Sequence, residues 1–229
     1  DFASLHIYAS GKIDNPKNTV DPALTMGAIV RRSLSEIRDT RPFLDSEHGP
    51  IHAFKDQRRT LPEAFDDEYF THLQWAHLAS GGAGGGMRWP NRHPHVLTPG
   101  MRRAQAALSR FLPLIDWVRF RRRNLNSEIV TSHRDLAVFG CGDQDQALVW
   151  LLRKAPLSPE GRLDRTAAPI RAMVRIPGLA SGTFRITPFD TEAGQALSGI
   201  DAQSRRGALV IEAPQLRSHL ALAVVRKPQ

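Results

Sequence analysis

The chain has 229 residues, of which 41% are hydrophobic and 24% are charged, as in a folded protein with one large domain or two small ones. It contains no run of 18 or more apolar residues, which excludes a membrane-spanning helix of the usual length. The formal net charge of +8 favours a polyanionic partner (nucleic acid, anionic lipid or acidic polysaccharide) or an arginine-rich surface without one. The single cysteine, Cys141, excludes an internal disulfide and a cysteine-rich zinc site, and it leaves the cellular compartment open.

The first half of the chain alternates between strand and helix patterns. Apolar residues recur at helical spacing after Asp21-Pro22, a pair typical of an N-cap with proline at the first helical position. The predicted elements, in chain order, are a strand over 3–9, a helix over 21–38, a strand over 41–47, a helix from Asp66 or Asp67, a strand ending at 85–89, and a helix from Thr98-Pro99 that includes Leu112 and Ile115. This alternation predicts a parallel α/β structure.

The second half has no helical period. After the basic run 119–126, short apolar runs are separated by turn sequences such as GCGD, SPEG and PGLASG. Turn sequences at this spacing are typical of an antiparallel β-sandwich. We therefore place a domain boundary near Asn126, with an α/β domain over 1–126 and an all-β domain over 127–229.

Polar and aromatic side chains follow each strand of the first half. In parallel α/β folds, functional residues lie at the carboxyl ends of the strands. The residues at the three strand ends are His6 and Tyr8, Glu47 and His48, and Arg88 and Trp89. Alternation along the second strand predicts that Asp45 lies on the same side as Glu47 but deeper, which gives Asp45 a structural role.

These residue types suit carbohydrate chemistry. A carboxylate can attack or stabilise an oxocarbenium-like carbon while a second carboxylic acid protonates the leaving oxygen. Trp and Tyr offer flat apolar faces to sugar rings, and His or Arg can donate to hydroxyl groups or hold a carboxylate ionised. The strand ends therefore indicate a site that handles glycans.

The order of these motifs resembles the last three strands of retaining (β/α)8-barrel glycoside hydrolases of the cellulase-like, family 5-type clan. The first strand ends in His-x-Tyr, the second ends in Glu shortly before Gly, and the third ends near Trp. The resemblance implies that Glu47 is the nucleophile, that His6 and Tyr8 contact the nucleophile and the substrate, and that Trp89 is a sugar platform.

The second half is similar to the small β-sandwich that closes many bacterial enzymes of this clan. The matching sequences are IPGLASGTFRITPFDTEAGQ and GALVIEAPQLRSHLALAVV. Two positions depart from the pattern of the clan, because Phe184 stands for the usual Tyr and His219 for the usual Asp. The resemblance thus covers nearly the whole chain.

Three strand–helix units do not close a barrel, which needs eight. We expect that another chain or a preceding segment completes it, and a start at Asp1, without Met or a signal segment, fits a processed or partial chain. In the clan the acid/base residue lies on the fourth strand, which this chain does not contain. The prediction is part of a retaining polysaccharide or glycoside hydrolase, inactive alone, in which Glu47 attacks and His48 and Arg88 join the substrate-binding residues. The alternative is a non-catalytic glycan-binding or structural subunit that completes a barrel with a partner.

No motif for a cofactor or a metal is present in the sequence. The glycine run in residues 79–90 lacks the Gly-Lys-Ser/Thr ending of a phosphate loop, so we expect it to allow close backbone passage instead. His72 and His77 are five residues apart and do not share a helix face. Gly49-Pro50 separates His48 from His52 and prevents a helical pair. We therefore expect no metal site.

The basic run 119–126 is the strongest candidate for nucleic-acid binding. Sites for single-stranded nucleic acid interleave aromatic and basic residues, and only Phe120 is aromatic in this run. We expect a solvated linker or an interdomain clasp. Cys141, without a histidine and asparagine nearby, is predicted to be a small buried apolar residue.

Overall fold

The computed structural model describes residues 1–229 except 38–40, 51–60, 86, 89–96 and 229. The chain divides into two compact units. Unit 1 comprises residues 1–104 and 157–163, and unit 2 comprises residues 105–156 and 164–229. Compact units of this kind need not be separate folding domains. The boundary near Asn126 therefore stays a prediction.

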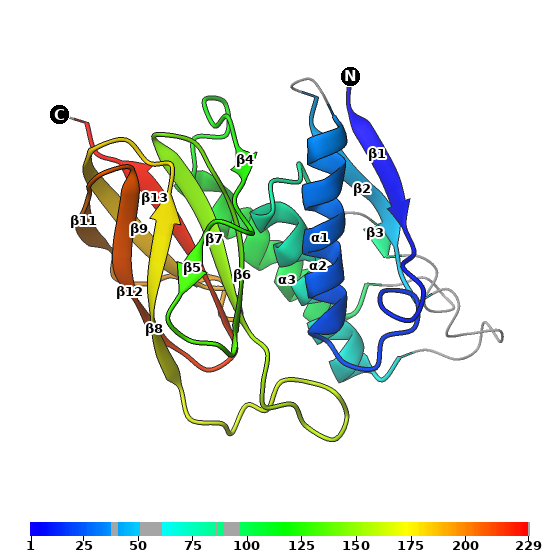
Figure 1. Ribbon diagram of the computed structural model, residues 1–229. Helices are drawn as coiled ribbons and strands as arrows, with labels where there is room; N and C mark the ends of the chain where they lie inside the picture. The colour runs from blue at the N-terminus through cyan, green and yellow to red at the C-terminus, as the bar shows by residue number, and fades with distance from the viewer. Residues whose placement is uncertain (38–40, 51–60, 86, 89–96, 229) are drawn as a thin grey trace. The chain divides into compact units, whose positions relative to one another are not determined.

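Unit 1 is a three-stranded parallel sheet with helices α1 and α2 on the same side of it (Figure 1). Its elements are β1 (Ala3–Ile7), α1 (Asp21–Glu36), β2 (Phe43–His48), α2 (Glu63–Ala79), β3 (Met87–Arg88) and the first residues of α3 (Pro99–Phe111). The strand order is β1-β2-β3, so each strand lies beside the next one in sequence. The predicted alternation of strands and helices is confirmed.

Local capping chemistry explains where α1 and α3 begin. Asn18 Oδ1 accepts hydrogen bonds from the backbone N–H groups of Val20 (2.9 Å) and Asp21 (2.8 Å). Asp21 is the first helical residue, so its prediction as the N-cap was wrong. Val20 is the N-cap, and the side chain of Asn18 accepts from the first free N–H groups. The prediction for α3 is confirmed, since Thr98 Oγ1 accepts from the N–H of Met101 at 3.1 Å.

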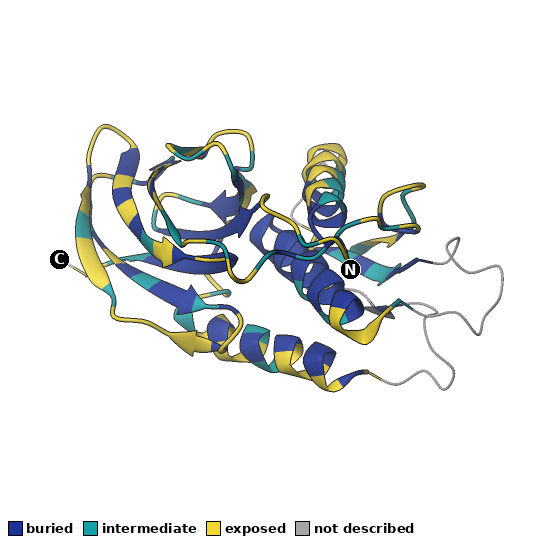
Figure 2. Cartoon of the chain, turned by 90° about the horizontal axis from the view of Figure 1, so that it is seen from below, coloured by how far each residue is buried: buried dark blue, intermediate teal, exposed yellow. Residues whose placement is uncertain are grey.

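Helix α2 is the most buried helix of unit 1, with 13 of its 17 residues buried (Figure 2). It begins at Glu63, after Pro62, and so earlier than the predicted Asp66 or Asp67. Its polar side chains find partners inside. Glu68 Oε1 accepts from Thr19 Oγ1 at 2.7 Å and from the N–H of Leu163 at 2.8 Å, which holds the 157–163 segment on unit 1.

The glycine run after α2 passes close to that helix. A Cβ atom on Gly82 would lie 2.1 Å from Cε1 of His77, and one on Gly85 would lie 1.5 Å from Oε1 of Gln74. Neither position has room for a larger residue unless the facing side chain moves. The predicted close backbone passage is therefore confirmed at these two glycines.

Unit 2 contains two antiparallel sheets. One sheet has seven strands in the order β10-β9-β13-β7-β6-β4, with β11 paired to β9, and the other has the order β12-β8-β5. The strands are β4 (Arg123–Asn124), β5 (Val130–Thr131), β6 (Leu136–Gly142), β7 (Gln146–Arg153), β8 (Ile170–Pro177), β9 (Gly182–Asp190), β10 (Gln195–Ala196), β11 (Ile200–Ser204), β12 (Ala208–Leu216) and β13 (His219–Arg226). The predicted antiparallel strands are confirmed, whereas the arrangement of a partial barrel followed by a sandwich stays a prediction.

Both sheets of unit 2 contribute to one hydrophobic core. Val149 of β7, Val174 of β8 and Leu209 of β12 belong to it, and each of the three is fully buried. On the other face of β7, the side chain of Trp150 packs against that of Phe139, with ring centroids 5.1 Å apart. β7 is therefore buried on both faces, which explains why its sequence is apolar without alternation.

Helix α3 ends earlier than the apolar spacing predicted. It stops at Phe111, and Leu112–Leu114 form a 3-10 turn. Pro113 has no N–H to donate and disfavours helical backbone at the residue before it. The prediction that Leu112 and Ile115 extend the helix was therefore wrong. No helix within the described residues is long and apolar enough to cross a membrane.

Candidate functional site

The strongest polar cluster at the carboxyl end of the parallel sheet is centred on Glu47. Tyr8 Oη donates a 2.7 Å hydrogen bond to Glu47 Oε1, and His6 Nδ1 lies 2.9 Å from the same oxygen. Register places His6 directly opposite Glu47 on the neighbouring strand, and Tyr8 follows β1 on the same side. Three of the six predicted site residues therefore lie together, with His6 and Tyr8 both in contact with the carboxylate of Glu47.

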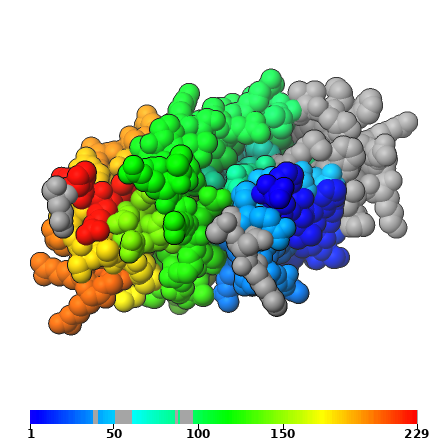
Figure 3. Space-filling view, turned by 90° about the horizontal axis from the view of Figure 1, so that it is seen from above, coloured from blue at the N-terminus to red at the C-terminus, as the bar shows by residue number. Residues whose placement is uncertain are grey.

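The Glu47 carboxylate is partly open to solvent. Its side chain is 20% exposed and that of His6 is 61% exposed. β1 lies at the surface of the molecule (Figure 3). Both contacts fall on Oε1, and no described residue makes a hydrogen bond to Oε2. Oε1 thus has two close polar contacts while Oε2 faces no described donor, an arrangement that suits a carboxylate nucleophile.

Tyr8 is held as a neutral hydrogen-bond donor. Partial burial and the hydrogen bond to Glu47 raise the pKa of its phenol well above the ordinary value. The phenol therefore donates to the Glu47 carboxylate throughout the neutral range and does not act as an acid or base there.

Glu47 lies on the side of the sheet that faces away from α2, called the open side below, and a β-bulge places it there. The pairing of β1 and β2 runs from Leu5 opposite Asp45 to His6 opposite Glu47, so Ser46 is an extra residue in β2. The prediction that Asp45 and Glu47 share one side of the strand was therefore wrong. A bulge inserts one residue and reverses the alternation beyond it, and bulges recur next to active sites, where they re-aim a side chain.

His48 lies on the opposite side from Glu47. Its side chain is fully buried, and its Nδ1 lies 2.6 Å from Oδ2 of the equally buried Asp45. The N–H of Asp45 donates to His77 Nε2 at 3.2 Å, which ties this pair to α2. The structure thus places His48 away from the three converging residues, behind the strand that carries Glu47.

Arg88 is also buried on the helix side. Its Nε donates to Asp66 Oδ1 of α2 at 2.8 Å, and its guanidinium lies 5.2 Å from the centroid of the Tyr69 ring. Register places Arg88 opposite His48, not opposite Glu47. Trp89, the expected sugar platform, lies outside the described residues. The roles predicted for His48, Arg88 and Trp89 in substrate binding stay predictions.

Several residues of this network were missed from the sequence. Asp66 and His77 lie on a helix whose apolar spacing gave no sign of the polar contacts, and Ser46 looks like any strand residue. The available signal in the sequence was the large number of polar residues in α2, which indicates buried polar contacts if the helix is buried. Among the described residues, no group of three or more His, Cys, Asp or Glu could hold a metal ion.

The two departures from the sandwich pattern of the clan are both buried in unit 2. Phe184 belongs to the hydrophobic core of the two sheets. His219 Nδ1 is hydrogen-bonded to Thr191 Oγ1, and its Nε2 lies 3.3 Å from Glu192 Oε1. His219 thus ties the start of β13 to the turn after β9. Burial raises the pKa of the Cys141 thiol to about 12, so this residue stays protonated and unreactive at neutral pH.

The comparisons with known proteins concern the fold. No family model matches the sequence, and no curated protein matches it. A glycoside hydrolase of family 5 from Bacteroides vulgatus is similar in structure, with a TM-score of 0.57 and 11% identity over 99% of this chain and 50% of that one. A second structure, described as a glycoside hydrolase, has a TM-score of 0.51 and 12% identity over 96% of this chain and 50% of that one.

These similarities define a class by fold alone. The chain has a glycoside hydrolase-like fold, and it spans about half the length of the solved structures that it matches. At this level of identity the likeness says nothing about substrate or mechanism.

Proposed function

We propose that this chain carries the nucleophile half of a retaining glycoside hydrolase. The observation that supports the proposal is the convergence of Tyr8 and His6 on Oε1 of Glu47, at the carboxyl end of the central parallel strand. Glu47 attacks the anomeric carbon, the bond to the leaving oxygen breaks, and a glycosyl ester forms on Oε2, which water then hydrolyses. Tyr8 and His6 keep the other oxygen in place.

The acid/base carboxylic acid comes from outside this chain. The described parallel sheet has three strands, and both β1 and β3 are edge strands in it. We propose that further strands, from a preceding segment or another chain, pair with these edges and bring a carboxylic acid to about 5–5.5 Å from Glu47, the separation typical of retaining enzymes. The substrate is a polysaccharide or glycoside.

A labelling experiment tests this function. The chain is combined with the segment or partner chain that provides the remaining strands, and is then treated with a 2-deoxy-2-fluoro glycoside. The fluorine slows hydrolysis of the ester, and an activated leaving group allows the ester to form. We expect a covalent adduct on Glu47, found by peptide mass mapping, and its loss in Glu47→Gln. The matched control, Glu36→Gln on the exposed end of α1, keeps the adduct.

The outcome of that experiment also decides between catalysis and binding. An adduct on another carboxylate refutes the role of Glu47. Glycan binding without any adduct or hydrolysis in the completed protein supports the alternative, a non-catalytic subunit that kept the fold.

A further inference from the structure

We propose that the buried Asp45–His48 pair is a positioning device, which locks the Ser46 bulge and so keeps Glu47 on the open side of the sheet. The catalytic consequence of this inference rests on the proposed function, but the structural claim does not. Asp45 and His48 would be positioning residues, because neither faces the side of the sheet on which Glu47 lies.

The geometry of a strand makes this pair depend on the bulge. In a regular strand, residues i and i+3 point to opposite faces and their Cα atoms are about 10 Å apart. Asp45 and His48 are such a pair, yet Oδ2 and Nδ1 are 2.6 Å apart and both side chains are fully buried. Their hydrogen bond exists only because Ser46 is an extra residue between them.

The register without a bulge would change the site. Alternation would then turn Glu47 toward the helices and His48 toward the open side, since a shift of one residue moves every later side chain to the other face. Glu47 would lose Tyr8 and His6 as partners. The Asp45–His48 hydrogen bond therefore favours the one register in which the Glu47 carboxylate contacts both Tyr8 and His6.

Further contacts hold the two ends of the bulge. The N–H of Asp45 donates to His77 Nε2 at 3.2 Å, and the His77 ring stacks on Phe43 with centroids 5.8 Å apart. Ser46 Oγ donates to the carbonyl oxygen of Leu5 at 3.2 Å, at the step where the pairing shifts. The extra residue is thus hydrogen-bonded across to β1, and the residue before it is hydrogen-bonded to α2.

Tyr8 reports the position of Glu47 without any need for hydrolysis. The chain has two tyrosines, Tyr8 and Tyr69, so NMR with ring-labelled tyrosine gives two titration curves, which Tyr8→Phe assigns. Burial raises the pKa of Tyr8, and the hydrogen bond to Glu47 raises it further. When Glu47 moves away, the pKa of Tyr8 falls toward the ordinary value of about 10.

The test replaces the pair and then removes the bulge. In Asp45→Leu/His48→Leu, which fills the same space with apolar side chains, we expect the pKa of Tyr8 to fall. Asp45→Asn keeps an acceptor for His48, and we expect it to preserve most of the elevation. Deleting Ser46 from the double variant returns Glu47 to the open side by ordinary alternation, so we expect the high pKa of Tyr8 to return.

The last comparison is matched in charge, because both chains lack Asp45, which itself raises the pKa of Tyr8 slightly. No fall in the pKa of Tyr8 in the folded double variant relative to the parent chain, or no recovery on deleting Ser46, overturns the proposal. If the double variant does not fold, two single variants are compared instead. Asp45→Asn should preserve most of the raised pKa of Tyr8, and His48→Leu should lower it. In the completed enzyme, loss of the pair lowers kcat with little change in KM, and failure of catalysis in the parent chain leaves the Tyr8 result valid.

Discussion

At the scale of single residues, the contact between Tyr8 and Glu47 is the feature with the clearest measurable consequence. Tyr8 Oη lies 2.7 Å from Glu47 Oε1, and an ionised phenol at this distance would repel the carboxylate. Burial acts in the same direction, because it disfavours the phenolate. The pKa of Tyr8 therefore depends on whether residue 47 is charged.

Glu47→Gln should lower the pKa of Tyr8 toward about 10. Glutamine keeps an acceptor for the phenol but removes the negative charge and weakens the hydrogen bond, while the contribution of burial stays. The measurement is the NMR titration of ring-labelled tyrosine. Glu36→Gln, an exposed carboxylate on α1, should leave the curve unchanged, and an equal fall in both variants would show that Tyr8 does not sense Glu47.

At the scale of secondary-structure elements, close packing between α2 and the glycine run can be tested with two alanine substitutions. A Cβ on Gly82 would meet the ring of His77 at 2.1 Å, whereas a Cβ on Gly84 would lie 3.7 Å from Cδ2 of Leu44, an ordinary contact. The two glycines are two residues apart, so they form a matched pair.

Gly82→Ala should destabilise the protein by about 1–3 kcal/mol, because overpacking forces the His77 ring to move. His77 also accepts the hydrogen bond from the N–H of Asp45, so part of the cost is the loss of that bond. Gly84→Ala should change the free energy of unfolding by less than about 0.5 kcal/mol. Urea unfolding measures both, and similar values for the two variants would contradict the packing described for this run.

The element order could be predicted from the sequence, and so could three residues of the site. Periodicity identifies helices and strands, and the rule that strand ends meet at one edge of a parallel sheet brings His6, Tyr8 and Glu47 together. The bulge could not be predicted, because an extra residue such as Ser46 leaves no trace in a period of two. For the same reason the opposite placement of His48 was not foreseen.

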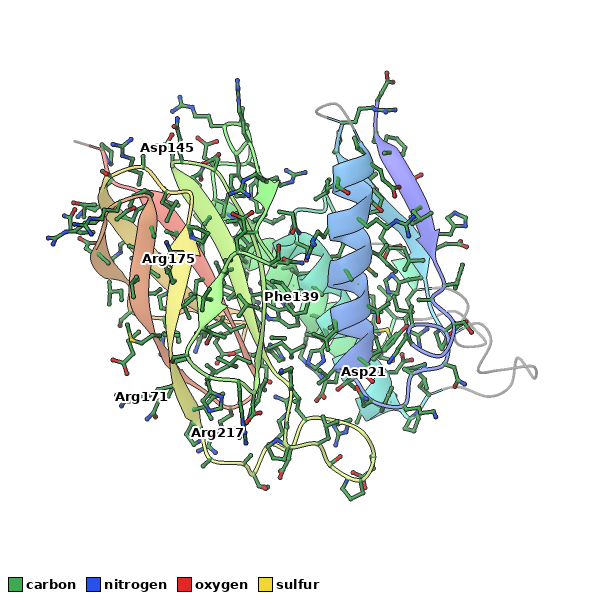
Figure 4. The ribbon with its side chains drawn as sticks, viewed as in Figure 1. Asp21, Phe139, Asp145, Arg171, Arg175 and Arg217 are labelled. Carbon is green, nitrogen blue, oxygen red and sulfur yellow. The ribbon has the colours of Figure 1, made fainter. Side chains whose placement is uncertain are left out.

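At the scale of the whole molecule, positive charge is concentrated in unit 2. It holds 17 Lys and Arg against 10 Asp and Glu, a formal charge of +7, whereas unit 1 has 14 against 13 and so +1. Arg171 and Arg175 lie along β8 (Figure 4). Arg175, Arg205 and Arg206 are exposed and form no ion pair with a described residue.

Retention on an acidic polysaccharide matrix should therefore depend mainly on unit 2. Replacing Arg175, Arg205 and Arg206 by Ala should lower the salt concentration needed for elution, because fewer counterions are released on binding. The control replaces three exposed arginines of unit 1, Arg31, Arg102 and Arg103, with the same change in net charge. Equal shifts for both triple variants would mean that net charge alone governs retention.

The 157–163 segment has a consequence for the modularity of this protein. It belongs to unit 1 although the residues on both sides of it belong to unit 2, and Glu68 and Thr19 bind its backbone. The chain therefore passes from one unit to the other three times. A single crossover in a gene cannot exchange either unit intact, and recombination that transplants unit 2 alone must leave this excursion behind or bring it without its partners.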